Sequence, residues 1–336
     1  MDKLHDINFY KKVHYSELIQ MFTKAASFDE NNRFENVERL ILEMYKTDGF
    51  KLELEECVNL LLAIGRFRKC GVMLIDRVVE DIKHYTNELE FDHLTKILIN
   101  LSKVNYNNRG FVRHLANMML SFVDEDSILD PFTISNTIKS FGRFSYYNEK
   151  LIKILMSIME KEEVLAEFQL HDLVTIFTSI SKILSSNSVN YTKLNINRYM
   201  RMLANKISTS DINTETAMKL INASGRILYN YERFLNTLIE SINLNEVDDL
   251  SKLCKLKINC DKLSLFYPEL NTRIREIERT LRPVADEAIE TDKQPEGKSI
   301  SEESDMEDFE RTIYVRRNII HRDLRLPSVR KRKWTY

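Results

Sequence analysis

The chain has few of the residues that bend or break a backbone: its 336 residues include seven glycines and five prolines. A fold rich in strands needs more of both residues at its tight turns. Long helices that are joined by short polar turns need few of either. Because 43% of the residues are hydrophobic and 30% are charged, the composition is that of a folded, highly charged protein. We therefore expect an all-α fold.

Several kinds of functional signal are absent from the sequence. No apolar run approaches the roughly 18 residues of a membrane-spanning helix, so we expect no membrane insertion. The four cysteines form no C-x-x-C pair, and they are followed by no histidine at zinc-finger spacing, so we expect buried free thiols. The histidines show no metal-ligand spacing, and no P-loop or Rossmann-type phosphate loop is present. We expect no metal, no cofactor and no enzymatic activity.

A short motif recurs along the chain. It consists of a small residue, a base and an apolar residue, as in Gly65-Arg66-Phe67 and Gly142-Arg143-Phe144. With the small residue called position 0, clear copies stand at residues 65, 102, 142, 181 and 225, and looser copies at 26 and 261. Their spacing is 36 to 44 residues, and three of the seven glycines occupy this one position. A fixed period of this length indicates a helical-repeat protein.

Apolar residues recur at fixed offsets around the motif. Positions −8, −5, −1 and +2 are three or four residues apart, so they share one face of a helix. A second apolar series begins nine residues after position 0, at Leu74, Phe111, Leu151, Phe234 and Leu270. Each repeat is therefore predicted to be a helix, a turn and a second helix, which stack on neighbouring repeats to bury their apolar faces. We expect a right-handed α-solenoid of about seven repeats over residues 15–281.

The two ends of the chain differ from this repeat region. Residues 1–14 contain neither the apolar core of a signal peptide nor a clear organelle presequence, and we treat them as a leader. Residues 282–310 are predicted to be an acidic disordered linker, since positions 285–310 hold eleven acids against two bases. Residues 311–336 form a basic tail that holds nine bases against one acid. Its cluster of Arg330, Lys331, Arg332 and Lys333 is interpreted as a nucleic-acid contact, a nuclear signal or a partner of the acidic segment.

A polar stripe is predicted on the first helix of each repeat. Positions −6, −2 and +1 share a face, and in the last six repeats these eighteen positions hold nine bases and no acid. We expect this face to be exposed. The residues at −6 are Asn59, Lys96, Asn136, Thr175, Lys219 and Lys255; at −2, Ala63, Asn100, Ser140, Ser179, Ala223 and Asn259; at +1, Arg66, Lys103, Arg143, Lys182, Arg226 and Lys262.

A line of bases followed by amides and hydroxyls suits single-stranded RNA. The bases are expected to contact phosphates, and Asn59, Asn100, Asn136, Ser140, Ser179 and Asn259 to contact bases or sugars. The competing interpretation is structural, because Lys and Arg near the C-terminal end of a helix interact favourably with its dipole and its last carbonyls. That interpretation accounts for position +1 and leaves position −6 unexplained.

The helix endings LLLAIGRF (60–67), ILINLSKV (97–104) and TIKSFGRF (137–144), together with the period, carry a family resemblance. The repeats resemble those of the heptatricopeptide and octotricopeptide families of organellar RNA-binding proteins. They are also similar to FAST-kinase-like mitochondrial proteins and to helical subunits of kinetoplastid RNA-editing substrate-binding complexes. Many family members end in a RAP domain, a nuclease-like module, whereas this chain ends in the acidic and basic segments.

The resemblance implies a mitochondrial protein that works on RNA, in rRNA or mRNA processing, stability or mitoribosome assembly, with ribonucleoprotein subunits as partners. Nucleus and cytoplasm are the alternative compartments. A second functional hypothesis is a protein–protein interaction scaffold, since α-solenoids also bind peptides and protein subunits.

Overall fold

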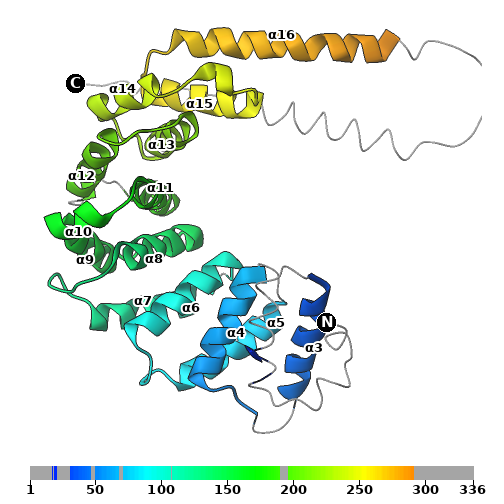
Figure 1. Cartoon of the computed structure of the whole chain (residues 1–336), viewed down its shortest axis with the longest axis vertical. Coiled ribbons are helices and arrows are strands. Elements are labelled where there is room, and N and C mark those ends of the chain that lie inside the picture. Colours follow the sequence, from blue (N-terminus) through cyan, green and yellow to red (C-terminus); the bar gives the residue numbers. More distant parts are fainter. Residues whose placement is uncertain are drawn as a thin grey trace, which may run out of the picture. The chain divides into compact units, whose positions relative to one another are not determined.

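The computed structural model describes residues 17, 19–20, 31–46, 50–67, 71–106, 108–189 and 196–290. Within these ranges the protein is all-α: 14 helices and one 3-10 turn follow one another, with no strand (Figure 1). This confirms the prediction of an all-α fold. The chain divides into two compact units, Met1–Glu278 and Arg279–Tyr336.

The helices pack sequentially in adjacent pairs (Figure 1). The helix that ends in the small-basic-apolar motif is the first helix of each pair. The first helices are α4 (Leu54–Phe67), α6 (Phe91–Lys103), α8 (Pro131–Phe144), α11 (Leu170–Ser186), α13 (Thr214–Ile227) and α15 (Leu250–Lys262). The second helices are α3 (Asn31–Met44), α5 (Val72–His84), α7 (Arg109–Phe122), α9 (Glu149–Glu160), α12 (Ile196–Ser208), α14 (Glu232–Glu240) and α16 (Pro268–Glu290). Two short connectors are α10 (Glu162–Glu167) and the 3-10 turn η3 (Leu244–Glu246).

Some predicted segments lie outside the described residues. They include the leader, the loose motif copy at residues 26–28, and the chain beyond Glu290 with its basic cluster. Helix α16 continues past Arg282 and Pro283 to Glu290, into the segment that the sequence predicts to be an acidic linker.

The core consists of the predicted apolar columns. Every residue at positions −8, −5 and −1 of the six first helices is at most 2% exposed, from Cys57 in α4 to Cys260 in α15. The second series is equally buried: Leu74, Leu151 and Phe234 are fully buried, and Phe111 and Leu270 nearly so. The helical periodicity of the sequence therefore identified the buried face of both helices in each pair.

Short polar side chains begin many of these helices. The Asp130 carboxylate accepts a hydrogen bond from the backbone N–H of Thr133 at 2.9 Å, with Pro131 in the first turn of α8. The amide oxygens of Asn108 and Asn148 cap α7 and α9 in the same way, at 3.0 and 3.1 Å. Such caps pair backbone donors that have no partner within the helix.

Five first helices end in the same backbone turn: in α11 it lies at Ser188 and Val189, and in the other four it lies at the same position of the repeat. The residue at position +3 has a positive φ of 51° to 56°, and the N–H of position +4 donates to the carbonyl of position −1 at 2.9 to 3.1 Å. This is a Schellman motif, which pairs carbonyls that the helix leaves open. The residues at +3 are Asn105, Ser145, Leu228 and Ser264, and those at +4 are Tyr106, Tyr146, Tyr229 and Leu265.

The first helices contact one another through a line of paired positions that we call the seam. Position 0 of each helix faces position −2 of the next first helix. A side chain on Gly142 would meet the Ser179 Cβ at 2.9 Å and its Cα at 3.2 Å, and the Ser102 hydroxyl donates to that of Ser140 at 3.2 Å. The same pairing joins Gly65 to Asn100, Gly225 to Asn259, and the Ser181 hydroxyl to the carbonyl of Ala223. The small residues of the motif therefore allow close helix approach.

Candidate nucleic-acid interface

The six first helices run parallel and present one exposed face. At their N-terminal ends His93 lies 3.0 Å from Glu55 of the preceding first helix, and at their C-terminal ends the seam joins equivalent positions. A helix turns by about 100° per residue, which places position −3 opposite the apolar columns, with −10, −6 and +1 beside it. In all six helices the residues at these four positions are exposed or half-buried, and none of them is buried. We call the residues at positions −10, −6, −3 and +1 the ridge.

Position +1 of the ridge is a continuous row of bases. Arg66, Arg143, Lys182, Arg226 and Lys262 are exposed, and Lys103 is half-buried. Lys103 donates to the Asn100 amide oxygen at 3.2 Å, and Arg143 to the Ser102 hydroxyl at 3.5 Å. Arg66, Lys182, Arg226 and Lys262 form no ion pair with any residue that the structure describes. The row therefore presents positive charge on the first helices of six successive pairs.

Position −6 carries a more mixed charge. Lys96 pairs with Asp92 at 2.5 Å, and Lys219 with Glu215 at 2.8 Å, each one helical turn apart. Asn59 and Lys255 are exposed, whereas Asn136 is half-buried and donates to the Phe132 carbonyl at 2.9 Å. Since acids pair with two of its three lysines, this position contributes less positive charge than the sequence pattern alone indicates.

The prediction for position −2 is wrong, because these side chains lie in the seam and not on the exposed face. Asn100 and Ser140 are 2% exposed and Asn259 is 7% exposed, and Ser179 is half-buried against Gly142. Their polar groups have partners inside the protein. Asn259 donates to the Asn222 amide oxygen at 2.7 Å and to the Lys255 carbonyl at 2.8 Å.

The sequence pattern missed position −3, which lies at the centre of the ridge. Its residues are Leu62, Ile99, Lys139, Thr178, Asn222 and Ile258, half-buried or exposed in every helix. The signal was present, because the antipode of the four apolar columns falls at −3. The prediction was instead based on the polar residues at −2. Their polar groups lie between neighbouring first helices.

The helix-capping explanation of the basic row can be compared with these contacts. In α6, α8, α13 and α15 the backbone turn already pairs the last carbonyls, so the base at +1 is not needed as a donor to them. An interaction with the helix dipole remains for these helices, since the bases lie in their last turns. Helix α11 is different, because it continues to Ser186 and Lys182 lies before its last turn. The base at position +1 of α11 is therefore present although the helix does not end there.

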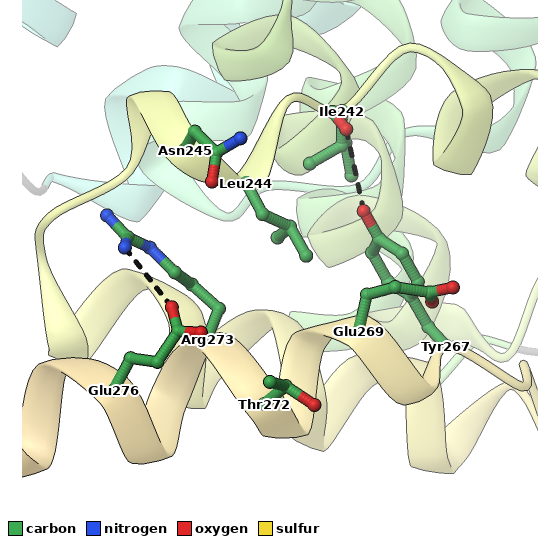
Figure 2. Close-up of a pocket in the computed structure, with 8 residues that line it drawn as sticks. All are labelled: Ile242, Leu244, Asn245, Tyr267, Glu269, Thr272, Arg273 and Glu276. Atoms are coloured by element: carbon green, nitrogen blue, oxygen red, sulfur yellow. Dashed lines mark hydrogen bonds and ion pairs between the residues drawn. The ribbon is translucent and has the colours of Figure 1, made fainter.

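The C-terminal part of the first unit holds a pocket of about 410 Å³ beside η3 and α16 (Figure 2). Ile242, Leu244 and Tyr267 supply apolar wall, and the Tyr267 hydroxyl lies 3.5 Å from the Ile242 carbonyl. Arg273 is engaged by carboxylates, with Asp248 at 2.8 Å and Glu276 at 3.4 Å. The pocket contains no pairing of a nucleophile with a general base, so its residues do not indicate a reaction.

The cysteines that the structure describes are free thiols. Cys57 and Cys260 are buried, Cys254 is half-buried, and Cys70 lies outside the described residues. Burial raises the pKa of the Cys260 thiol to about 11, so it is protonated and unreactive at neutral pH. No cluster of metal-ligating side chains occurs among the described residues. None of the helices in that part of the chain is long and apolar enough to cross a membrane.

Comparison with known proteins adds no relative: neither a protein-family model nor a curated protein matches the chain.

Proposed function

We propose that the chain is a right-handed α-solenoid of about seven repeats that binds single-stranded RNA along the ridge, without enzymatic activity. The observation that carries this proposal is the row of six bases at +1, which continues through α11 where no helix end accounts for it. Evenly spaced bases on parallel helices suit the regular phosphates of a single strand. The amide and hydroxyl side chains at −6 and −3, such as Asn59, Thr178 and Asn222, are the candidates for contacts with bases and sugars.

The resemblance of the repeats to heptatricopeptide and octotricopeptide proteins extends the proposal to cellular context. We place the protein in mitochondrial RNA processing or stability, or in mitoribosome assembly, as one subunit of a larger ribonucleoprotein. The basic cluster from Arg330 to Lys333 would add affinity that does not depend on RNA sequence.

The salt dependence of RNA binding tests this proposal. Contacts from six bases predict a log–log slope of affinity against salt near −4, at about 0.7 per phosphate contact. Replacing Arg66, Lys182, Arg226 and Lys262 by Gln should reduce the slope by about 3 and weaken binding strongly at physiological salt. Fluorescence anisotropy with a labelled single-stranded RNA measures both quantities, and far-ultraviolet circular dichroism checks that the helices persist.

A matched control removes the same charge elsewhere. The exposed bases of the second helices, Arg77, Arg113, Lys150 and Arg233, are replaced by Gln in the full chain. This variant should bind RNA with the wild-type slope to within about one contact. Equal losses in the two quadruple variants would show a diffuse charge effect and would exclude the ridge as the site.

A specific surface favours the second candidate function, a protein-binding scaffold. Three apolar side chains are exposed around the loop between α7 and α8: Phe122 at the end of α7, Ile128 in the loop at 90% exposure, and Phe132 at the start of α8. Asp124, Glu125 and Asp126 stand in the same loop, and their charge repels nucleic acid. Exposed apolar side chains on an ordered loop are typical of protein contacts. An affinity for protein subunits with little salt dependence, in the absence of RNA binding, would favour this function.

A further inference from the structure

The large apolar side chains that the described chain exposes are gathered in three places. Two groups lie at the start of α5 and around the α7–α8 loop, the latter including the end of α7 and the start of α8. The third lies where α13 and α15 end, and its members are Leu228 at 59% exposure, Ile258 at 45% and Phe266 at 89%. Isolated exposed apolar residues need no explanation, but three at one end of a pair of adjacent helices do.

This third group adjoins the basic row. Leu228 follows Arg226 by two residues, and Phe266 follows Lys262 by four, in the turn that leaves α15. Ile258 occupies position −3 of the ridge, beside Asn259, which Gly225 of α13 contacts. Helices α13 and α15 are therefore held together just where their apolar and basic side chains are exposed.

Leu228 also has an unfavourable backbone conformation. It occupies the left-handed turn position at φ 55°, where the other four Schellman turns have Asn105, Ser145, Ser188 and Ser264. Asparagine and serine tolerate this conformation better than a branched apolar side chain does. Leu228 is 59% exposed, so burial of its side chain offsets this strain only in part.

Phe266 departs from its equivalent in the preceding repeat in the same way. It stands at position +5, where the turn after α13 has the exposed Asn230. The Phe266 ring is almost fully exposed, while its neighbour Tyr267 lines the pocket of Figure 2. Proteins hold an unpaired base next to its phosphates with an exposed aromatic face and neighbouring cations, and Phe266 follows the exposed Lys262 by four residues.

We infer that the end of the ridge at α13 and α15 is a base-stacking site, in which Phe266 stacks on an unpaired nucleobase whose flanking phosphates contact Arg226 and Lys262. Leu228 and Ile258 supply apolar surface around the base. The inference rests on the proposed RNA-binding function and adds a contact that does not depend on charge. The acidic α7–α8 loop, with its similar apolar content, has no cations and is not such a site.

The stacking site is tested by removing the Phe266 ring and the RNA bases, each alone and both together, as in a double-mutant cycle. Full-length wild type and Phe266→Ala are titrated with fluorescein-labelled oligoadenylate and with the same sugar–phosphate chain lacking its bases. Stacking predicts that wild type loses about tenfold in affinity on the abasic strand, and that Phe266→Ala loses about tenfold on oligoadenylate. Phe266→Ala should then bind the two strands nearly equally. Its salt slope should equal that of wild type, because no phosphate contact is removed.

Two further variants separate this inference from the proposed function. Asn230→Ala, at the same turn position one repeat earlier, should bind both strands as wild type does. Lys262→Gln should lower the salt slope by about 0.7 and retain the preference for the strand with bases. Unchanged binding by Phe266→Ala, with a wild-type slope near −4, would overturn the stacking site and leave the RNA-binding ridge in place. Absence of any salt-dependent RNA binding by wild type would overturn both, as would binding only to acidic peptides.

Discussion

The seam and the ridge belong to the same six helices, but their repeated residues have different causes. In the seam, side chains at positions 0 and −2 are matched across each pair of helices, and their polar groups are paired within the protein. On the ridge, the base at +1 recurs, and its side chain is exposed in five of the six helices. A repeated residue that is buried is explained by packing, whereas a repeated exposed residue calls for a partner. Two predictions test this difference and a third tests the turn that follows α13, in order of decreasing effect.

The largest effect is expected from adding bulk to the seam. Gly142→Leu would place its Cβ 2.9 Å from the Cβ of Ser179 and 3.2 Å from its backbone Cα, which cannot move alone. We expect a loss of about 3 kcal/mol or more in the free energy of unfolding, because overpacking forces the helices apart. Urea denaturation followed by circular dichroism measures it. The control is Gly110→Leu at the exposed start of α7, where only the Asn108 side chain is within contact distance. Equal stability of the two variants would show that the seam is not tightly packed.

The second prediction compares one substitution on both surfaces. Asn259→Lys in the seam buries a charge and removes hydrogen bonds to Asn222 and Lys255, so it should destabilise the fold by about 2 kcal/mol. Asn59→Lys on the ridge should change stability by less than about 0.5 kcal/mol. It should also make the salt slope of RNA binding steeper by about 0.7. Thermal unfolding and anisotropy separate the two results, and similar stability losses would remove the distinction between seam and ridge.

The smallest effect concerns the turn after α13. Leu228→Asn gives this turn the residue found in the equivalent turn after α6, at Asn105. Relief of the left-handed strain should stabilise the protein by about 1 kcal/mol, measured by urea denaturation. The matched variant Asn105→Leu should destabilise by a similar amount. A loss of stability in Leu228→Asn would indicate that the Leu228 side chain makes a stabilising contact that outweighs the strain.

The parts of the fold that the sequence predicted are those set by local periodicity. The apolar columns identified the buried face of each first helix, and the motif identified the end of every first helix except α11, which continues to Ser186. The prediction from the sequence missed one regularity of the motif. A tyrosine stands at position +4 in three repeats, at Tyr106, Tyr146 and Tyr229.

The error at position −2 has a different origin. Polar residues at Asn100 and Asn259 resembled an exposed stripe, because residue type alone does not tell whether water or a neighbouring helix pairs an amide. That distinction depends on where the next helix lies, which the small residues at Gly65 and Gly225 determine from a repeat away. For the ridge, the sequence supplied the charge and the structure supplied its exposure and its pairing with Asp92 and Glu215.

The matched sizes in the seam also restrict how such a chain can evolve by losing or duplicating repeats. Glycine stands opposite an asparagine at Gly65–Asn100 and Gly225–Asn259, whereas Ser181 faces Ala223. Deleting the repeat that contains α13 would set Ser181 against Asn259. Asn259 now faces Gly225, which has no side chain, so the Ser181 side chain would crowd the asparagine. A change in the number or order of repeats therefore preserves this packing only where the residues at positions 0 and −2 still match in size.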